Sequence, residues 1–342
     1  MKKLIFLITF FALAIFAQYN LTPTYAQLVP PECNSMDGMD MGQPQSCPPA
    51  PTPTVAINPD AANTVAVRKN IYSLTPDELS RLTNAFNTVR ANGSYNRFMD
   101  IHMQAMMLRT PADDTSTLRN AAHRGPVFLP WHRAFVWEFE QLLRTVDPTV
   151  SVPYWAFENE TPGTIPMVFS AGYFGSDGNI AQGDRVTDGP FASWGIVRRI
   201  GRDTGGQSAL PSAGDIASVL QINEYDAAPY NESSTGFRNA MEGWVGINAP
   251  WGIHNRVHAY VGGDMLPTGM SGNTVNDPIF WLVHANMDRI WWQWQQTHGV
   301  TNYLPVVGGP EGHNLNDVML LLPSQGTPAN TLDINQMNYT YN

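Results

Sequence analysis

The chain has 342 residues, of which 43% are hydrophobic and only 14% are charged, and it contains 28 glycines and 27 prolines. This length is sufficient for a large hydrophobic core, and the composition is typical of a loop-rich globular protein, which excludes a coiled coil or a repeat array. The formal net charge is −10 and no basic cluster stands out. We therefore expect no nucleic-acid partner, whereas an acidic surface does not exclude small molecules.

The first 26 residues have the pattern of a secretory signal peptide. Two lysines precede an almost entirely apolar run over residues 4–17, and small residues around Ala26 provide a cleavage site. The apolar run is short for a membrane span, and no later stretch is long enough to cross a bilayer. The sequence therefore predicts a secreted or extracytoplasmic protein with no stable membrane span after cleavage.

Residues 27–64 are rich in Pro, Gln, Asn and Ala and predict a disordered leader and linker. The only two cysteines, Cys33 and Cys47, lie in this leader, and whether they pair is left open. Between them, the segment 36–41 contains three methionines, whose thioethers are ligands that soft metal ions prefer. We expect the ordered, catalytic domain to cover residues 65–342.

Helical patterns recur along this domain. A Thr75-Pro76 start followed by acidic residues predicts a helix to about residue 91, and a second helix begins near residue 95 and carries His102. Residues 110–122 are a polar loop. Apolar residues at helical spacing then predict a helix from Pro130 to about Val146.

The second half of the chain is more irregular. Residues 160–235 lack a long periodic pattern, which indicates long surface loops with short strands or turns. The patterns over residues 251–263 and about 278–298 predict two further helices. The last forty residues predict irregular structure with one short strand over 318–322. The fold class expected is mainly α, with long irregular loops and few short strands.

Six of the eight histidines fall into two sets of three: His102, His123 and His132, and then His254, His258 and His284. His254 and His258 are four residues apart, so on a helix both imidazoles lie on one face and can reach one metal. Neutral imidazoles suit Cu, Zn, Fe or Ni. Two such sets predict a pair of metal ions. A catalytic zinc site also uses three protein ligands, but the HExxH pattern of zinc proteases is absent, which favours copper.

Two longer motifs carry a family resemblance. Residues 123–133, HRGPVFLPWHR, closely resemble the first copper motif of tyrosinases and related polyphenol oxidases, and residues 277–289, DPIFWLVHANMDR, resemble the second. The Tyr-x-Tyr at 339–341 is similar to the one that closes the family's catalytic core. The resemblance covers about residues 67–341 and is closest to bacterial-type tyrosinases.

The resemblance implies a core four-helix bundle that holds two copper ions as a type 3 pair, with dioxygen as co-substrate. The first histidine set would bind one copper and the second set the other, and Phe280 would supply an aromatic wall. The implied reactions are o-hydroxylation of monophenols to o-diphenols and oxidation of o-diphenols to o-quinones.

Two further residues match the family's proton-handling pair. In the family, a Glu and an Asn hold a water that takes the proton from an incoming monophenol, and Glu242 and Asn255 occupy the matching positions here. A phenol has a pKa near 10 and must lose its proton to bind a metal, so this pair predicts hydroxylase activity. The alternative for Glu242 is an ordinary supporting or helix-capping carboxylate.

Four polar residues are expected to support the site or the fold around it. Asp277 and Asp288 are candidate acceptors for the outer N–H groups of metal-binding imidazoles, with a helix cap or an arginine pair as the alternative. Arg133 and Arg289 are expected to tie helices together. The two remaining histidines, His298 and His313, are expected to have surface or loop roles.

Three other functions compete with a tyrosinase. The first is a catechol oxidase or o-aminophenol oxidase with the same fold and no hydroxylase step. The second is an oxygen carrier of the haemocyanin kind, and the third is a copper-binding module in which the methionine-containing leader is the functional part. The natural phenol, the oligomeric state and the need for a copper-delivery helper are left open by the sequence.

Overall fold

The structure is a computed structural model that describes residues 64–203, 209–246, 249–266, 273–322 and 326–342. The predicted signal peptide, the leader up to residue 63 and both cysteines lie outside the described residues. Within the described part of the chain, no helix is both long and apolar enough to cross a membrane.

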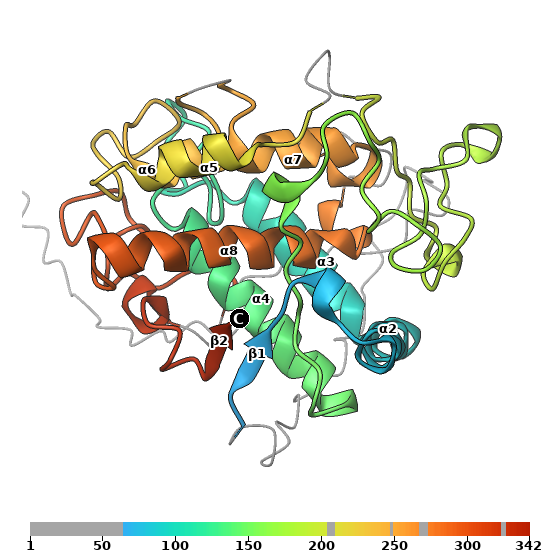
Figure 1. The fold of residues 1–342 in the computed structure, drawn as a ribbon. Coiled ribbons are helices and arrows are strands. Elements are labelled where there is room, and N and C mark those ends of the chain that lie inside the picture. The colour runs from blue at the N-terminus through green and yellow to red at the C-terminus, as the bar shows by residue number, and fades with distance from the viewer. Residues whose placement is uncertain (1–63, 204–208, 247–248, 267–272, 323–325) are drawn as a thin grey trace, which may run out of the picture. The chain divides into compact units, whose positions relative to one another are not determined.

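The described residues are mainly helical, as predicted, and short 3-10 turns and irregular loops connect the helices (Figure 1). Strands are limited to one short parallel pair. The α-helices are α2 (Pro76–Ala91), α3 (Ser94–Met107), α4 (Phe128–Val146), α5 (Ala213–Leu220), α6 (Phe237–Glu242), α7 (Ile253–Val261) and α8 (Ile279–His298), and the strands are β1 (Ala66–Arg68) and β2 (Tyr339–Tyr341).

Local sequence signals explain where the first helices begin and end. At the start of α2, the Thr75 hydroxyl accepts a hydrogen bond from the Glu78 backbone N–H at 3.2 Å, and the Glu78 carboxylate accepts one from the Thr75 N–H at 2.8 Å. This capping box satisfies two N–H groups that would otherwise lack partners, and confirms the predicted start. Gly93, in a left-handed conformation with φ of 82°, then separates α2 from α3.

Helices α4 and α8 form the centre of the fold, where they cross (Figure 1). The ring of Phe139 in α4 stacks on that of Trp281 in α8, with centroids 3.7 Å apart and planes 10° apart. The structure starts α4 at Phe128, two residues before the predicted Pro130. Proline is tolerated there because the first-turn N–H groups have no partner within the helix.

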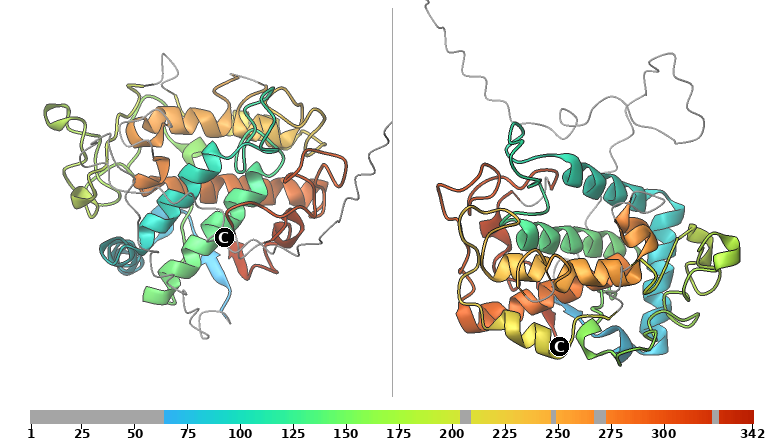
Figure 2. Two further views of the ribbon diagram at one scale, coloured as in Figure 1. Left: turned by 180° about the vertical axis from the view of Figure 1, so that it is seen from behind. Right: turned by 90° about the horizontal axis from the view of Figure 1, so that it is seen from above.

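The remaining helices pack around this pair. Helix α2 lies against both α3 and α4, and α5 contacts both α6 and α8. Helix α6 packs against α7 (Figures 1 and 2). Thus α3, α4, α7 and α8, the helices expected to carry metal ligands, surround one region of the core.

Strands β1 and β2 bring together the beginning and end of the described chain. They pair in parallel, with Ala66 beside Tyr339 and Arg68 beside Tyr341. Because the Arg68 side chain is fully buried, its charge requires partners inside the protein. It donates hydrogen bonds to Glu140 of α4 at 3.0 Å and to Asp288 of α8 at 3.1 Å.

Asp288 is the shared hydrogen-bond acceptor of this buried cluster. It accepts hydrogen bonds from Arg133 of α4, Arg68 and two tyrosine hydroxyls of β2. Burial opposes ionisation of this carboxyl, but the two guanidinium groups outweigh burial and hold its pKa below the usual value. Two buried cations thus balance two buried carboxylates. We call this cluster the Asp288 network; its members are Arg68, Arg133, Glu140, Asp288, Tyr339 and Tyr341.

Two expectations for the less periodic segments are wrong. Residues 318–322 form a turn instead of a strand, since Leu321 adopts a positive φ of 69°. Helix α5 was not predicted, although Ser212 and Asp215 form a capping box at its start. His313 lies in a loop as expected but is fully buried, where its Nε2 is 2.6 Å from the Thr110 hydroxyl.

We predict that Asp288→Asn destabilises the protein by about 3–5 kcal/mol, because the variant leaves two buried arginines with only one carboxylate. Urea unfolding of metal-free protein measures this without a contribution from bound metal. The control is Asp77→Asn: that side chain is 80% exposed and 3.8 Å from Arg81, so its loss should cost less than about 1 kcal/mol. Equal midpoints for Asp288→Asn and the unmodified protein would show that the network does not hold the fold.

Candidate metal centre

The first histidine set converges on one point from three parts of the chain. His102 comes from the middle of α3, His123 from the loop between α3 and α4, and His132 from the first turns of α4. One ring nitrogen of each lies within 4.8 Å of those of the other two. This spacing allows one metal ion to contact all three residues.

The second set is built by α7 and α8. His254 and His258 lie one turn apart on α7, with ring centroids separated by 4.3 Å, and His284 faces them from α8. The three again offer ligand atoms within 4.8 Å of one another. The Nε2 atoms of His258 and His284 are 3.3 Å apart, so they point at the same place.

The two clusters adjoin each other. The rings of His132 and His284, one from each cluster, stack with centroids 4.3 Å apart and planes 11° apart. His254 of the second cluster has ring centroids 6.1 Å from His123 and 6.3 Å from His132 of the first. Two metal ions held by these clusters would therefore share one chamber.

Hydrogen bonds on the outer side of the rings leave the inner nitrogens available. The Nδ1 atoms of His132 and His258 lie 2.8 Å from the Phe128 carbonyl and 2.7 Å from the Met265 carbonyl. A carbonyl oxygen only accepts, so each Nδ1 carries the proton and each Nε2 keeps its lone pair. Outer partners of this kind orient metal-binding imidazoles.

Two other rings have a similar arrangement with side-chain partners. His102 Nδ1 is 3.2 Å from the Thr274 hydroxyl, and His254 Nδ1 is 3.0 Å from the Asn255 side-chain oxygen. The Nε2 atoms of His102, His132 and His254 are buried without a hydrogen-bond partner among the described residues. Buried nitrogens without partners are costly, and a bound metal would satisfy them, so these residues fit the expected metal pair.

Burial lowers the pKa of all six imidazoles, and neighbouring histidines lower most of them further. The pKa falls to about 3 for His132 and to about 4 for His258. The rings are therefore neutral near pH 7, and neutral imidazole is the form that binds metal ions.

Phe280 lies where the sequence placed it, against both clusters. Its side chain is fully buried, and its ring centroid is 4.2 Å from that of His284 and 5.0 Å from that of His102. An aromatic wall of this kind reduces access of water to the chamber.

Glu242 is buried at the end of α6 and is held by groups on two sides. One carboxylate oxygen accepts a hydrogen bond from the Arg124 backbone N–H at 2.6 Å, and the other accepts one from Arg238 at 3.1 Å. Burial raises the pKa of Glu242, while Arg238 and the Arg124 N–H oppose that rise. Because Arg124 follows His123, the carboxylate lies directly behind the loop that carries this histidine.

Asn255 lies on α7 beside the segment that follows Glu242. A Cβ added to Gly243 would lie 3.2 Å from the Asn255 Cβ, so the Asn255 side chain packs against Gly243. The amide of Asn255 bridges two groups: its oxygen faces His254, and its nitrogen donates to the Pro250 carbonyl at 3.0 Å. The structure thus packs Asn255 against the residue that follows Glu242.

The two aspartates follow the alternative expected for them. Asp277 caps the start of α8 through the Ile279 N–H and pairs with the buried Arg198. Asp288 pairs with arginines in the Asp288 network. The imidazoles are instead hydrogen-bonded to two backbone carbonyls and to the Thr274 and Asn255 side chains. Phe128, Asn255 and Met265 lie within seven residues of the histidines they contact, whereas Thr274 lies 172 residues from His102 and could not be found from local spacing.

The buried His313 and the half-exposed His298 lie outside both clusters. His313 packs beneath the loop of the first cluster: a Cβ on Gly125 would lie 2.5 Å from its ring, which explains the glycine two residues after His123. His298 lies at the end of α8, with its Nε2 2.9 Å from the Leu220 carbonyl. Arg289 pairs with Glu158, as expected for a residue that ties segments together.

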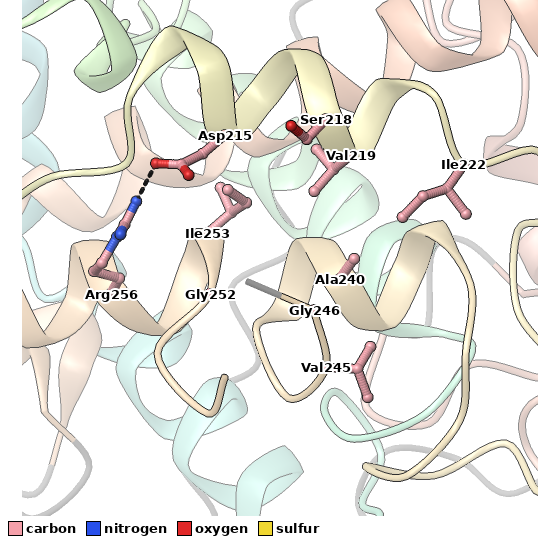
Figure 3. Close-up of a pocket in the computed structure, with 10 residues that line it drawn as sticks. All are labelled: Asp215, Ser218, Val219, Ile222, Ala240, Val245, Gly246, Gly252, Ile253 and Arg256. Atoms are coloured by element: carbon pink, nitrogen blue, oxygen red, sulfur yellow. Dashed lines mark hydrogen bonds and ion pairs between the residues drawn. The ribbon is translucent and has the colours of Figure 1, made fainter. Parts of the chain in front are cut away.

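A cavity of about 170 Å³ lies between α5, α6 and α7, where Arg256 pairs with Asp215 (Figure 3). None of its lining residues is a cluster histidine. Ile253 and Arg256 line it from α7, and helical spacing places them on the face opposite His254 and His258. This cavity is therefore behind the site.

Comparisons with known proteins agree with this geometry. The family model "common central domain of tyrosinase" matches residues 92–297. The tyrosinase of Streptomyces glaucescens is 40% identical over 81% of this chain and 99% of its own length. In fold, the chain resembles a polyphenol oxidase from Thermothelomyces thermophila (22% identity, TM-score 0.58, 81% of this chain and 88% of that one). It also resembles a functional unit of Octopus hemocyanin (23% identity, TM-score 0.52, 81% and 68%). The chain therefore belongs to the tyrosinase family, the copper enzymes that oxidise phenols.

Proposed function

We propose that this protein is an exported tyrosinase that both hydroxylates monophenols to o-diphenols and oxidises o-diphenols to o-quinones. The observation that carries the proposal is the pair of adjoining three-histidine clusters with inward-facing nitrogens. The 40% identity to proteins named tyrosinase over most of the chain supports it. Export rests on the signal-like first 26 residues.

In this proposal, His102, His123 and His132 hold one copper ion and His254, His258 and His284 hold the other. Copper bound there supplies the redox chemistry, one electron per ion, that activates dioxygen. The protein's own contribution is to fix six neutral imidazoles around one chamber. Phe280 and the burial of five of the six rings limit the access of water to that chamber.

Hydroxylation also requires that a phenol lose its proton, and Glu242 and Asn255 are the residues we assign to this step. A free phenol has a pKa near 10, so at neutral pH it arrives protonated. The Glu242 carboxylate has spare acceptor capacity beyond its two hydrogen bonds, and burial makes it more basic than an exposed glutamate. A water held between Glu242 and Asn255 could pass the phenol proton to this carboxylate.

A catechol oxidase is the main alternative, because an o-diphenol can be oxidised without the Glu242 step. An oxygen carrier is disfavoured by the 40% identity to proteins named tyrosinase over most of the chain. The likeness to a hemocyanin unit concerns the fold alone and does not separate carriers from oxidases.

Oxygen uptake by purified, copper-loaded protein tests the function directly. We expect two copper ions per chain, uptake with both a simple monophenol and its catechol, and no uptake after copper is removed with a chelator. Restoring copper should restore both activities. Uptake with catechol alone would identify a catechol oxidase, and bound copper without uptake on either substrate would favour a carrier.

We expect Glu242→Gln to lower kcat on a monophenol by at least about tenfold more than kcat on the matching catechol, because general-base catalysis typically contributes 10²–10⁴-fold. Arg238 keeps its 2.8 Å pair with Asp226 in this variant, so the fold should survive. The matched control is Asp226→Asn, which alters the same arginine without touching the loop of His123. An equal loss on both substrates would mean that Glu242 only supports the structure.

Deleting residues 27–63 tests whether the methionine-containing leader is needed for function. Since the clusters are formed only by residues from His102 onwards, the shortened protein should bind two copper ions and oxidise catechol at an unchanged rate. Copper titration and oxygen uptake on both forms provide the measurement. Loss of copper binding in the shortened form would make the leader the functional part.

A further inference from the structure

The candidate site comes nearest to solvent at His123. Five of the six cluster histidines are buried, and His123 alone among them is partly exposed. The residue that follows it, Arg124, is also partly exposed. A phenol that approaches the first cluster from this side would pass beside Arg124.

The position of Arg124 is fixed by both its backbone and its side chain. Its backbone has a positive φ of 59°, and its N–H is bound by the Glu242 carboxylate at 2.6 Å. Its guanidinium carbon lies 4.0 Å from the centre of the Trp244 ring, a cation–π contact. Trp244 is placed in turn by Gly243, which packs against Asn255 on α7.

Among the described residues, no carboxylate forms an ion pair with this guanidinium and its side chain has no hydrogen bond; it stacks on the Trp244 ring. Glu242 accepts the Arg124 backbone N–H through one carboxylate oxygen and a hydrogen bond from Arg238 through the other. A stacked guanidinium still offers its N–H edge, which matches the two oxygens of a carboxylate.

We propose that Arg124 is a specificity-determining residue that selects phenols and catechols carrying an anionic group, such as a carboxylate, on their side chain. The inference rests on the proposed function and names the substrate class of that same site. Trp244 holds the guanidinium on the partly exposed loop of His123, and the cation offsets the repulsion that a chain of net charge −10 exerts on an anionic substrate. The hydroxyl end of the substrate then faces the clusters.

The first test compares three catechols on the copper-loaded protein: 3-(3,4-dihydroxyphenyl)propionate, neutral 4-methylcatechol and cationic dopamine. Arg124→Gln should raise KM for the carboxylate about 10- to 100-fold, the range expected for one charge-assisted hydrogen-bond pair, with kcat changed little. KM for 4-methylcatechol should stay within about twofold, and Arg124→Lys should recover part of the preference. The control is Arg185→Gln, which removes one charge from an exposed arginine bonded to the Gly195 carbonyl.

The second test does not depend on oxidase activity. Calorimetry measures binding of 3-phenylpropionate and of its neutral amide to the purified protein with and without Arg124. We expect the carboxylate to bind at least about tenfold more tightly than the amide, and the difference to vanish in Arg124→Gln and to shrink at high salt. Added salt should weaken it because part of the contact is exposed.

These readouts separate the inference from the proposed function. Selective binding without oxygen uptake would retain the carboxylate site and overturn the oxidase. Oxygen uptake without any preference for the carboxylate, in kinetics and in binding, would overturn the role of Arg124 and leave the oxidase intact. Equal losses on all three catechols in Arg124→Gln would also overturn the inference, since they would show that Arg124 only positions the loop of His123.

Discussion

The buried ion pair between Arg133 and Asp288 is the constraint on which the metal centre depends. Arg133 directly follows His132 on α4, and Asp288 lies one helical turn after His284 on α8. The pair therefore joins the two helices beside the point where His132 and His284 stack. A buried charge without a partner is strongly unfavourable, so neither helix can slide along the other without breaking the Asp288 network. The distance between the two histidine clusters follows from this restriction.

The network also explains why the two ends of the described domain matter for a site that neither end reaches. Strand β1 supplies Arg68, and strand β2 supplies the two tyrosine hydroxyls that donate hydrogen bonds to Asp288. Without the parallel strand pair, the charges in the network would not balance. The Tyr-x-Tyr pattern at 339–341 therefore has a physical role: it completes the polar surroundings of a carboxylate that fixes α8.

The sequence predicted the parts of the structure that depend on local rules. Helices with capping signals and a period of 3.6 residues were placed to within about two residues, and the motif resemblance grouped all six histidines as the structure groups them. What the sequence left open depends on distant contacts. His313 was expected in a surface or loop role and lies in a loop, but the segment around Gly125 encloses it. Asp288 has the right helical spacing to support His284, but two arginines from other elements bind it, which was the alternative expected.

Arg124, which follows His123, makes two contacts that its sequence does not reveal. The backbone N–H of Arg124 is bound by the carboxylate that we assign to proton transfer, while its side chain is stacked on Trp244. Glu242 cannot move without releasing the loop that holds both a metal-facing imidazole and the guanidinium beside it. In the proposed function, proton transfer, placement of His123 and selection of the substrate's charge are thus coupled through one hydrogen bond. This coupling gives a physical reason why the carboxylate is buried and paired with Arg238: burial makes it more basic than an exposed glutamate, and its fixed position holds the loop.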